Sequence, residues 1–177
     1  RRGGPARNRS PVPASCAPRP AAHRKDCPRP HRSQWESFDY AYGLVQQRVR
    51  NALDGKFNAI ERLLAIVSVF QGIVEDPPVA GGCPILNTAI EADDANELLR
   101  DRARSAMNDW RTTIHRIVNK GIERQEIRPG VDADEVASIL IVTLEGAIML
   151  SNLFKDPVHM KRAADHMVRF IGTMRLL

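Results

Sequence analysis

Cysteine and histidine side chains gather in the first 31 residues, where their types could bind a metal ion. The four residues follow the spacing C-x6-H-x3-C-x3-H and are Cys16, His23, Cys27 and His31. Structural zinc sites use other paired spacings, and a hydrophobic run should follow to form the core of a finger. None follows here, so we expect no zinc site. We also expect no metal ion or cofactor elsewhere, because no carboxylate or cysteine completes a set with His159 and His166.

Catalytic signatures are missing from the sequence as well. There is no G-x-S-x-G nucleophile elbow, no H-E-x-x-H zinc motif and no phosphate-binding loop. The neighbouring acids Glu91, Asp93 and Asp94 are better explained as charges at a helix end and in a loop than as a catalytic acid and base. We therefore expect that the protein is not an enzyme.

Positive charge is concentrated at the N-terminal end of the chain. Residues 1–36 carry nine of the 26 Lys and Arg residues, two of the 21 acids and seven of the twelve prolines, whereas residues 37–177 have a net charge of −2. A segment with so few aliphatic side chains cannot offset its ordering entropy by burial. We predict that residues 1–33 are a disordered Arg/Pro-rich tail. Such a tail would bind nucleic acid without sequence preference, or, as we favour, not at all.

The remaining sequence has the periodicity of helices. Apolar residues recur at intervals of three and four, and glycines and prolines punctuate the pattern. Trp35 and Phe57 are expected on the buried stripes of the first two helices. The sequence predicts an all-α protein, with an antiparallel bundle of about six helices over residues 34–177. The expected helices are 34–54, 56–75, 84–92, 94–123, 133–154 and 157–174.

The segment 136–154 tests whether the chain enters a membrane. It is long enough to span a bilayer, but Glu145 lies at its centre, where a charge costs about 3 kcal/mol. A buried helix of a cytoplasmic protein explains this segment better, and three cysteines, an odd number, also favour a reduced compartment. Because the helix is apolar nearly all round, its surplus apolar surface suggests burial against a second chain.

Three segments in order carry a family resemblance: GGCPILNTAIEA (81–92), GIERQEIRPGVDADEVA (121–137) and ASILIVTLEGAIMLSNLFKDP (137–157). Their order and spacing resemble the C-terminal region of the tetracycline-repressor (TetR) family of bacterial transcription regulators. Gln125 stands where the family pattern usually has a second glycine, and Glu145-Gly146-Ala147 fits the penultimate helix.

The resemblance implies a function. Members of this family are homodimers that bind a small-molecule effector among their middle helices and release operator DNA. Their helix-turn-helix and its recognition motif are not recognisable in residues 1–33. We expect a TetR-type regulator, a repressor, whose residues 34–177 bind a small apolar or amphipathic effector and dimerise. The alternative is an all-α dimeric interaction module that neither senses a ligand nor binds DNA.

The resemblance also points to residues for each role. For most of the pocket candidates, packing in the core explains the residue as well as a pocket does, or more simply. For Asn87 and Glu145, the simpler explanation is a capped or exposed position. The pocket candidates are Phe70, Cys83, Leu86, Asn87, Met107, Trp110, Ile114 and Glu145. The last two helices of each subunit are expected to form a four-helix interface, with candidates Ile141, Leu144, Ala147, Ile148, Met167, Ile171 and Gly172.

Overall fold

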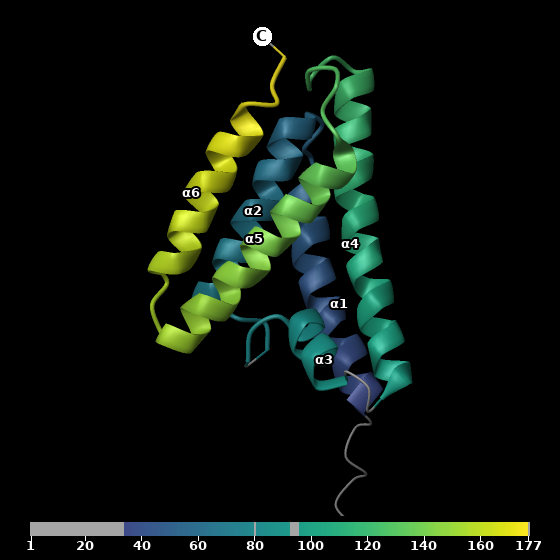
Figure 1. Ribbon diagram of the computed structural model, residues 1–177, viewed down its shortest axis with the longest axis vertical. Helices are drawn as coiled ribbons and strands as arrows, with labels where there is room; N and C mark the ends of the chain where they lie inside the picture. Colours follow the sequence, from purple (N-terminus) through teal and green to yellow (C-terminus); the bar gives the residue numbers. More distant parts are fainter. Residues whose placement is uncertain (1–33, 80, 93–95, 177) are drawn as a thin grey trace, which may run out of the picture. The chain divides into compact units, whose positions relative to one another are not determined.

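The computed structural model describes residues 34–79, 81–92 and 96–176 (Figure 1). The predicted tail with its cysteine and histidine set lies outside these residues, as do Asp93 and Asp94. The described residues form six α-helices and no strand, which confirms the predicted all-α class. The helices are α1 (Gln34–Leu53), α2 (Ala59–Glu75), α3 (Pro84–Ala92), α4 (Glu97–Glu123), α5 (Ala133–Phe154) and α6 (Val158–Gly172).

The start of α2 corrects one prediction. Asn58 is the N-cap, and its side-chain oxygen accepts hydrogen bonds from the backbone N–H groups of Ile60 and Glu61. The helix therefore begins at Ala59, and Phe57 stays in the preceding loop with 80% of its surface exposed. Trp35, also expected to be buried, is 44% exposed because it lies in the first turn of α1, beyond the main packing contacts.

Polar side chains also fix where α5 and α6 begin. Asp132 is the N-cap of α5 and accepts hydrogen bonds from the N–H groups of Asp134 and Glu135. The buried hydroxyl of Ser151 on α5 accepts from the N–H of Met160 at 3.1 Å. This bond satisfies a donor in the first turn of α6 from within the preceding helix, and so holds the two helices together where they meet.

The central helix of the bundle is α2, which packs against α1, α4, α5 and α6. Eight of its 17 residues are buried, and Figure 1 shows α5 crossing in front of it. By contrast, only three residues of the 20-residue α1 are buried, namely Phe38, Ala41 and Val45. Since burial of apolar surface is the main stabilising contribution, α1 is held less firmly than α2.

Gly121 allows a close approach of α4 to the start of α2. A Cβ atom at this position would lie 2.6 Å from the Cβ of Ala59 and 2.7 Å from the Cδ1 of Ile127. The carbonyl of Gly121 also accepts from the N–H groups of Glu126 and Ile127. The chain then pairs with its own C-terminal end through an isolated bridge between Ile127 and Arg175. The short distances to Ala59 and Ile127 mean that the packing at position 121 requires a glycine.

By length and composition, α5 is the one helix of the described residues that could cross a membrane. In its most apolar window, 44% is buried inside the bundle. Within the subunit, α5 contacts α2, α4 and α6.

Candidate functional site

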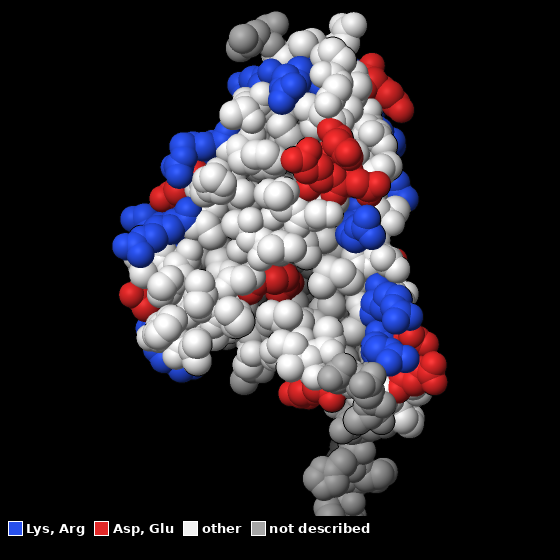
Figure 2. Space-filling view, viewed as in Figure 1, with Lys and Arg blue, Asp and Glu red and all other residues white. Residues whose placement is uncertain are grey.

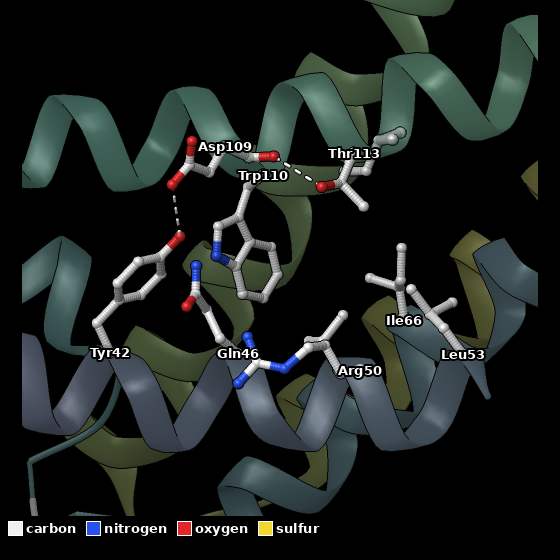
Figure 3. A pocket seen from close by; sticks show the side chains of 10 residues that line it. Tyr42, Gln46, Arg50, Leu53, Ile66, Asp109, Trp110 and Thr113 are labelled. Carbon is white, nitrogen blue, oxygen red and sulfur yellow. Dashed lines mark hydrogen bonds between the residues drawn. The ribbon is translucent and has the colours of Figure 1, made fainter.

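A cavity of about 190 Å³ lies between α1 and α4 (Figure 3). Its walls come mainly from these two helices, with one residue from α2, and most of the lining surface is apolar. In Figure 3 the indole ring of Trp110 extends from α4 toward α1 across the cavity. The lining residues are Tyr42, Gln46, Val49, Arg50, Leu53, Ile66, Asp109, Trp110, Thr113 and Ile114.

Tyr42 closes one end of this cavity. Its hydroxyl lies 3.3 Å from the carboxylate of Asp109 and 3.3 Å from the carbonyl oxygen of Ala106, and can donate to either. Burial of the ring, together with the negative charge of Asp109, raises the pKa of Tyr42 to about 12. The phenol is therefore a protonated donor throughout the physiological pH range.

Trp110 forms the boundary between the cavity and the core. Its ring meets that of Phe70 edge to face, with centroids 4.7 Å apart and an interplanar angle of 86°. Phe70 is only 2% exposed, so it supports Trp110 from the core side. The cavity thus has a rigid aromatic wall.

The predicted pocket residues lie in different parts of the bundle. Trp110 and Ile114 line the cavity, and Phe70 lies directly behind it. Met107 and Leu86 are partly buried against the core without lining the cavity.

The predicted pocket residue Asn87 instead supports the loop before α3. Its side-chain amide donates to the carbonyl of Gly81 at 2.8 Å. The side chain of Asn87 therefore fixes the loop, and it does not line the α1–α4 cavity.

Cys83 and Glu145, the last two pocket candidates, form a separate buried pair. The thiol of Cys83 lies 3.0 Å from Oε1 of Glu145, and the residues are 7% and 8% exposed. Burial raises the pKa of Glu145, and burial with the nearby carboxyl raises the pKa of the Cys83 thiol. A thiol held in this state is a poor nucleophile.

A glycine turn positions this pair. Gly82 has φ +94°, and a Cβ atom there would lie 2.5 Å from Nδ2 of Asn152 on α5. The turn can therefore approach α5 closely and place Cys83 beside Glu145. Neither member of the pair lines the α1–α4 cavity.

Several cavity residues were not among the candidates from the sequence, namely Tyr42, Gln46, Arg50, Asp109 and Thr113. A signal was available on α1, where Gln46 and Arg50 follow Tyr42 at intervals of four and so share one face. Their partners on α4 could not be inferred, because the pairing of α1 with α4 is a long-range contact.

The residues predicted for a dimer interface need correction. Five of them are 0–5% exposed in the single subunit, since they face its own core and have almost no surface left for a second chain. These five are Leu144, Ala147, Ile148, Met167 and Ile171. Ile141 is partly buried, and Gly172 is exposed with no atom within 4 Å of a Cβ built on it.

The exposed side of α5 carries the apolar surface that the sequence placed at an interface. Four of its residues are 41–72% exposed and recur, together with Gly146, at intervals of three and four. We call this set the α5 stripe; it comprises Ile139, Val142, Gly146, Met149 and Leu153. Figure 2 shows a broad uncharged surface over the middle of α5, with Asp and Glu at the upper end of this helix and Lys and Arg along the α6 edge.

Metal binding finds no support in the described parts of the chain, where no three His, Cys, Asp or Glu side chains group suitably. His159 instead contacts the ring of Phe154, with centroids 5.4 Å apart.

The comparisons with known proteins agree with this architecture. Residues 59–167 match the family described as "Tetracyclin repressor-like, C-terminal domain". A TetR transcriptional regulator from Chloroflexus aurantiacus J-10-fl is 42% identical, with a TM-score of 0.78 over 81% of this chain and 73% of that one. A TetR-family regulator from Cytophaga hutchinsonii is 30% identical, with a TM-score of 0.72 over 80% and 71%.

A more distant structure shares the fold alone. The ketosteroid transcriptional regulator of Mycobacterium tuberculosis is 18% identical, with a TM-score of 0.62 over 80% of this chain and 71% of that one. The search of curated proteins gave no match. The family match and the 42% identity nevertheless agree on one assignment: the chain belongs to the TetR family of transcriptional regulators.

Proposed function

We propose that residues 34–177 are the effector-binding and dimerisation domain of a cytoplasmic TetR-type repressor. The observation that carries the proposal is the cavity between α1 and α4, with its aromatic wall and its few polar groups. Ligand sites are typically concave, mostly apolar and provided with a small number of orienting polar groups.

The lining of the cavity suggests the chemistry of the effector. Val49, Leu53 and Ile114 would contact an apolar body, whereas Gln46 and Arg50 would orient a polar group. The volume of about 190 Å³ is below the roughly 300–1,000 Å³ of pockets for drug-sized molecules. We therefore expect a small apolar or amphipathic effector, or one that places only part of itself here.

Binding in this cavity would act through α1. An effector between α1 and α4 presses on the helix with few buried residues, whereas α2 is anchored on four sides. A shift of a weakly anchored helix is a common way to transmit binding over a distance. Operator DNA would be bound by a helix-turn-helix outside the described residues, to which a displacement of α1 would be relayed.

Dimerisation would use the α5 stripe together with Val168 and Gly172 of α6. Val168 is 49% exposed, and the two glycines of the surface, Gly146 and Gly172, leave open space above their backbones. Small residues at a helix crossing allow close approach, and a two-fold axis would use each residue twice.

Effector binding is tested by the fluorescence of Trp110 in a Trp35→Phe background. We expect 1-octanol, as a defined apolar probe, and the active members of a metabolite panel to quench Trp110 and to raise the melting temperature by mass action. Gln46→Phe should fill the cavity and abolish both effects. Ser37→Phe is the control, because the side chain of Ser37 is exposed on α1 and does not line the cavity.

The same experiment separates the two functions considered. Loss of the response in Gln46→Phe but not in Ser37→Phe supports the sensor. The absence of any response across the panel, or equal responses in both variants, would favour an interaction module that senses no ligand.

A further inference from the structure

A second cavity, of about 220 Å³, lies beside the first, where the α1–α2 loop and the start of α2 meet the second half of α4. We call it the basic cavity, because it is lined by five cationic side chains and one acid. The cations are Lys56, Arg62, Arg116, Lys120 and Arg124, and the acid is Glu126. If all six are charged, the lining has a net charge of +4.

Two of the guanidinium groups are held in place by the α1–α2 loop. Arg62 donates to the carbonyl of Lys56 at 2.9 Å, and Arg124 donates to the carbonyl of Phe57 at 3.2 Å. Arg116 and Lys120 stand one turn apart on the exposed face of α4. The ion pairs among the described residues all involve other cations, so their carboxylates do not neutralise this group.

The acid of the cavity is already engaged. Oε2 of Glu126 accepts from the N–H of Ala59 at 2.6 Å, and Asn58 takes the next N–H groups of α2. The helix end therefore offers few free donors to a ligand, and any anion in the cavity would be held by the cationic side chains.

Helix stability alone does not account for this charge. Cations near a helix C-terminus interact favourably with the helix dipole, which would explain Lys120 and Arg124 on α4. It does not explain Arg116, a turn further in, or Arg62, which lies in the first turn of α2, where the dipole disfavours a cation. Like charges one turn apart also repel each other. Such a cluster is typical of a site that binds an anion.

The position of the basic cavity links it to the effector site. Thr113 lines both cavities, so a ligand that passes over this residue would have its two ends in different surroundings. Phe57, 80% exposed, lines the basic cavity and adds apolar surface beside the charges.

We propose that the effector is an amphipathic organic phosphate, with its apolar part in the α1–α4 cavity and its phosphate in the basic cavity. This inference rests on the proposed effector function of the first cavity. Phosphate is favoured over a single carboxylate because five cationic side chains line one cavity, and a phosphate group offers them up to two negative charges and three acceptor oxygens.

Calorimetric titration of the full chain at low salt tests the proposal with octyl phosphate, octanoate, 1-octanol and inorganic phosphate. We expect octyl phosphate to bind at least tenfold more tightly than each of the others. Arg116→Gln combined with Lys120→Gln should remove this advantage and leave 1-octanol binding unchanged. Arg104→Gln is the matched control, since Arg104 is exposed on α4, pairs with Asp101 and does not line the cavity.

Each half of the site can fail separately. Equal affinity for octyl phosphate and 1-octanol, or for octyl phosphate and octanoate, would overturn the inference while the proposed function stands. Octyl phosphate that binds no better than inorganic phosphate, with no change in Trp110 fluorescence, would overturn both. Binding of duplex DNA that is lost in the variant with Arg116→Gln and Lys120→Gln would overturn the small-molecule assignment. Unchanged melting temperatures will confirm that the variants are folded.

Discussion

At the scale of single residues, the pair of Cys83 and Glu145 shows how burial sets protonation. Both groups lie in a nearly dry contact between the α3 turn and α5. Desolvation disfavours the carboxylate, so the pKa of Glu145 is raised above its ordinary value of 4.5. Its second oxygen, Oε2, is buried with no hydrogen-bond partner among the described residues. A protonated acid is cheaper to bury at such a position than a charged one.

Stability should therefore depend on the ionisation of Glu145. The folded state keeps the proton above pH 4.5 and the unfolded state releases it, so stability falls as pH rises from 4.5 to the raised pKa of the folded state. The slope can reach about 1.4 kcal/mol per pH unit. Glu145→Gln should lack this contribution and be more stable than the parent at the upper end of the range. Urea unfolding of the parent and of Glu145→Gln between pH 5 and 8 measures the slope of stability against pH and the difference in stability between the two proteins.

The control for this prediction is Glu91→Gln. Glu91 is exposed on α3, so its replacement should leave the pH dependence of the parent unchanged. A Glu145→Gln variant with the same slope as the parent would show that Glu145 is not the group responsible.

At the scale of elements, the turn between α4 and α5 contains a strained residue. Gln125 has φ +60°, a left-handed conformation that glycine adopts at little cost. We expect Gln125→Gly to stabilise the fold by roughly 0.5–1 kcal/mol, because relief of strain of about 1–2 kcal/mol exceeds the added entropy of the unfolded chain. Denaturant unfolding measures the gain.

A glycine in a regular helix gives the matched comparison. Gln47→Gly on α1 should destabilise by about 1 kcal/mol, since no positive φ is relieved there. A loss of stability in Gln125→Gly of similar size would mean that the side chain of Gln125 contributes more than its backbone strain costs.

The helices themselves could be predicted because their signals are local. Three-four spacing of apolar residues and the stops at Gly55 and Pro77 involve only neighbours in the sequence, and all six helices were found with small errors at the ends. Phe57 was misplaced because the cap at Asn58 competes with continuation of the apolar pattern. Boundaries depend on such single bonds and are harder to predict.

The site was only partly predictable because it depends on how helices pair. Trp110 and Ile114 were found from their stripe on α4, but Tyr42 and Arg50 required knowledge that α1 packs opposite them. The same dependence on helix packing explains why most of the interface candidates face the core of the subunit. Leu144 and Ile148 are as apolar as Val142, and only the packed bundle distinguishes the face of α5 that is buried within the subunit from the face that remains exposed.

At the scale of the whole molecule, the α5 stripe presents too much apolar surface for an isolated subunit in water. Val142 and Leu153 are 72% and 69% exposed; Met149 lies between them on the same face, and Ile139 lies one turn before Val142. Large contiguous apolar patches usually mark interaction sites. Burying one such side chain contributes roughly 1.5–3 kcal/mol, and about 1.4 kcal/mol changes an affinity tenfold. Because a two-fold axis uses each residue twice, these four would supply much of the apolar burial that the proposed dimer needs.

The decisive variant is therefore Val142→Glu. It removes apolar burial from the most exposed side chain of the stripe and adds a negative charge to each subunit at the proposed interface, so we expect the dimer dissociation constant to rise by about 100-fold or more, equivalent to about 3 kcal/mol. The subunit should keep its melting behaviour as a monomer, because the side chain of Val142 lies outside its core.

Leu98→Glu is the control, since Leu98 is 54% exposed on α4, away from the stripe, and its replacement should leave the dimer intact. Sedimentation equilibrium measures the association. A parent chain that sediments as a monomer at tens of micromolar, or equal dissociation of both variants, would exclude the α5 stripe as the dimer interface.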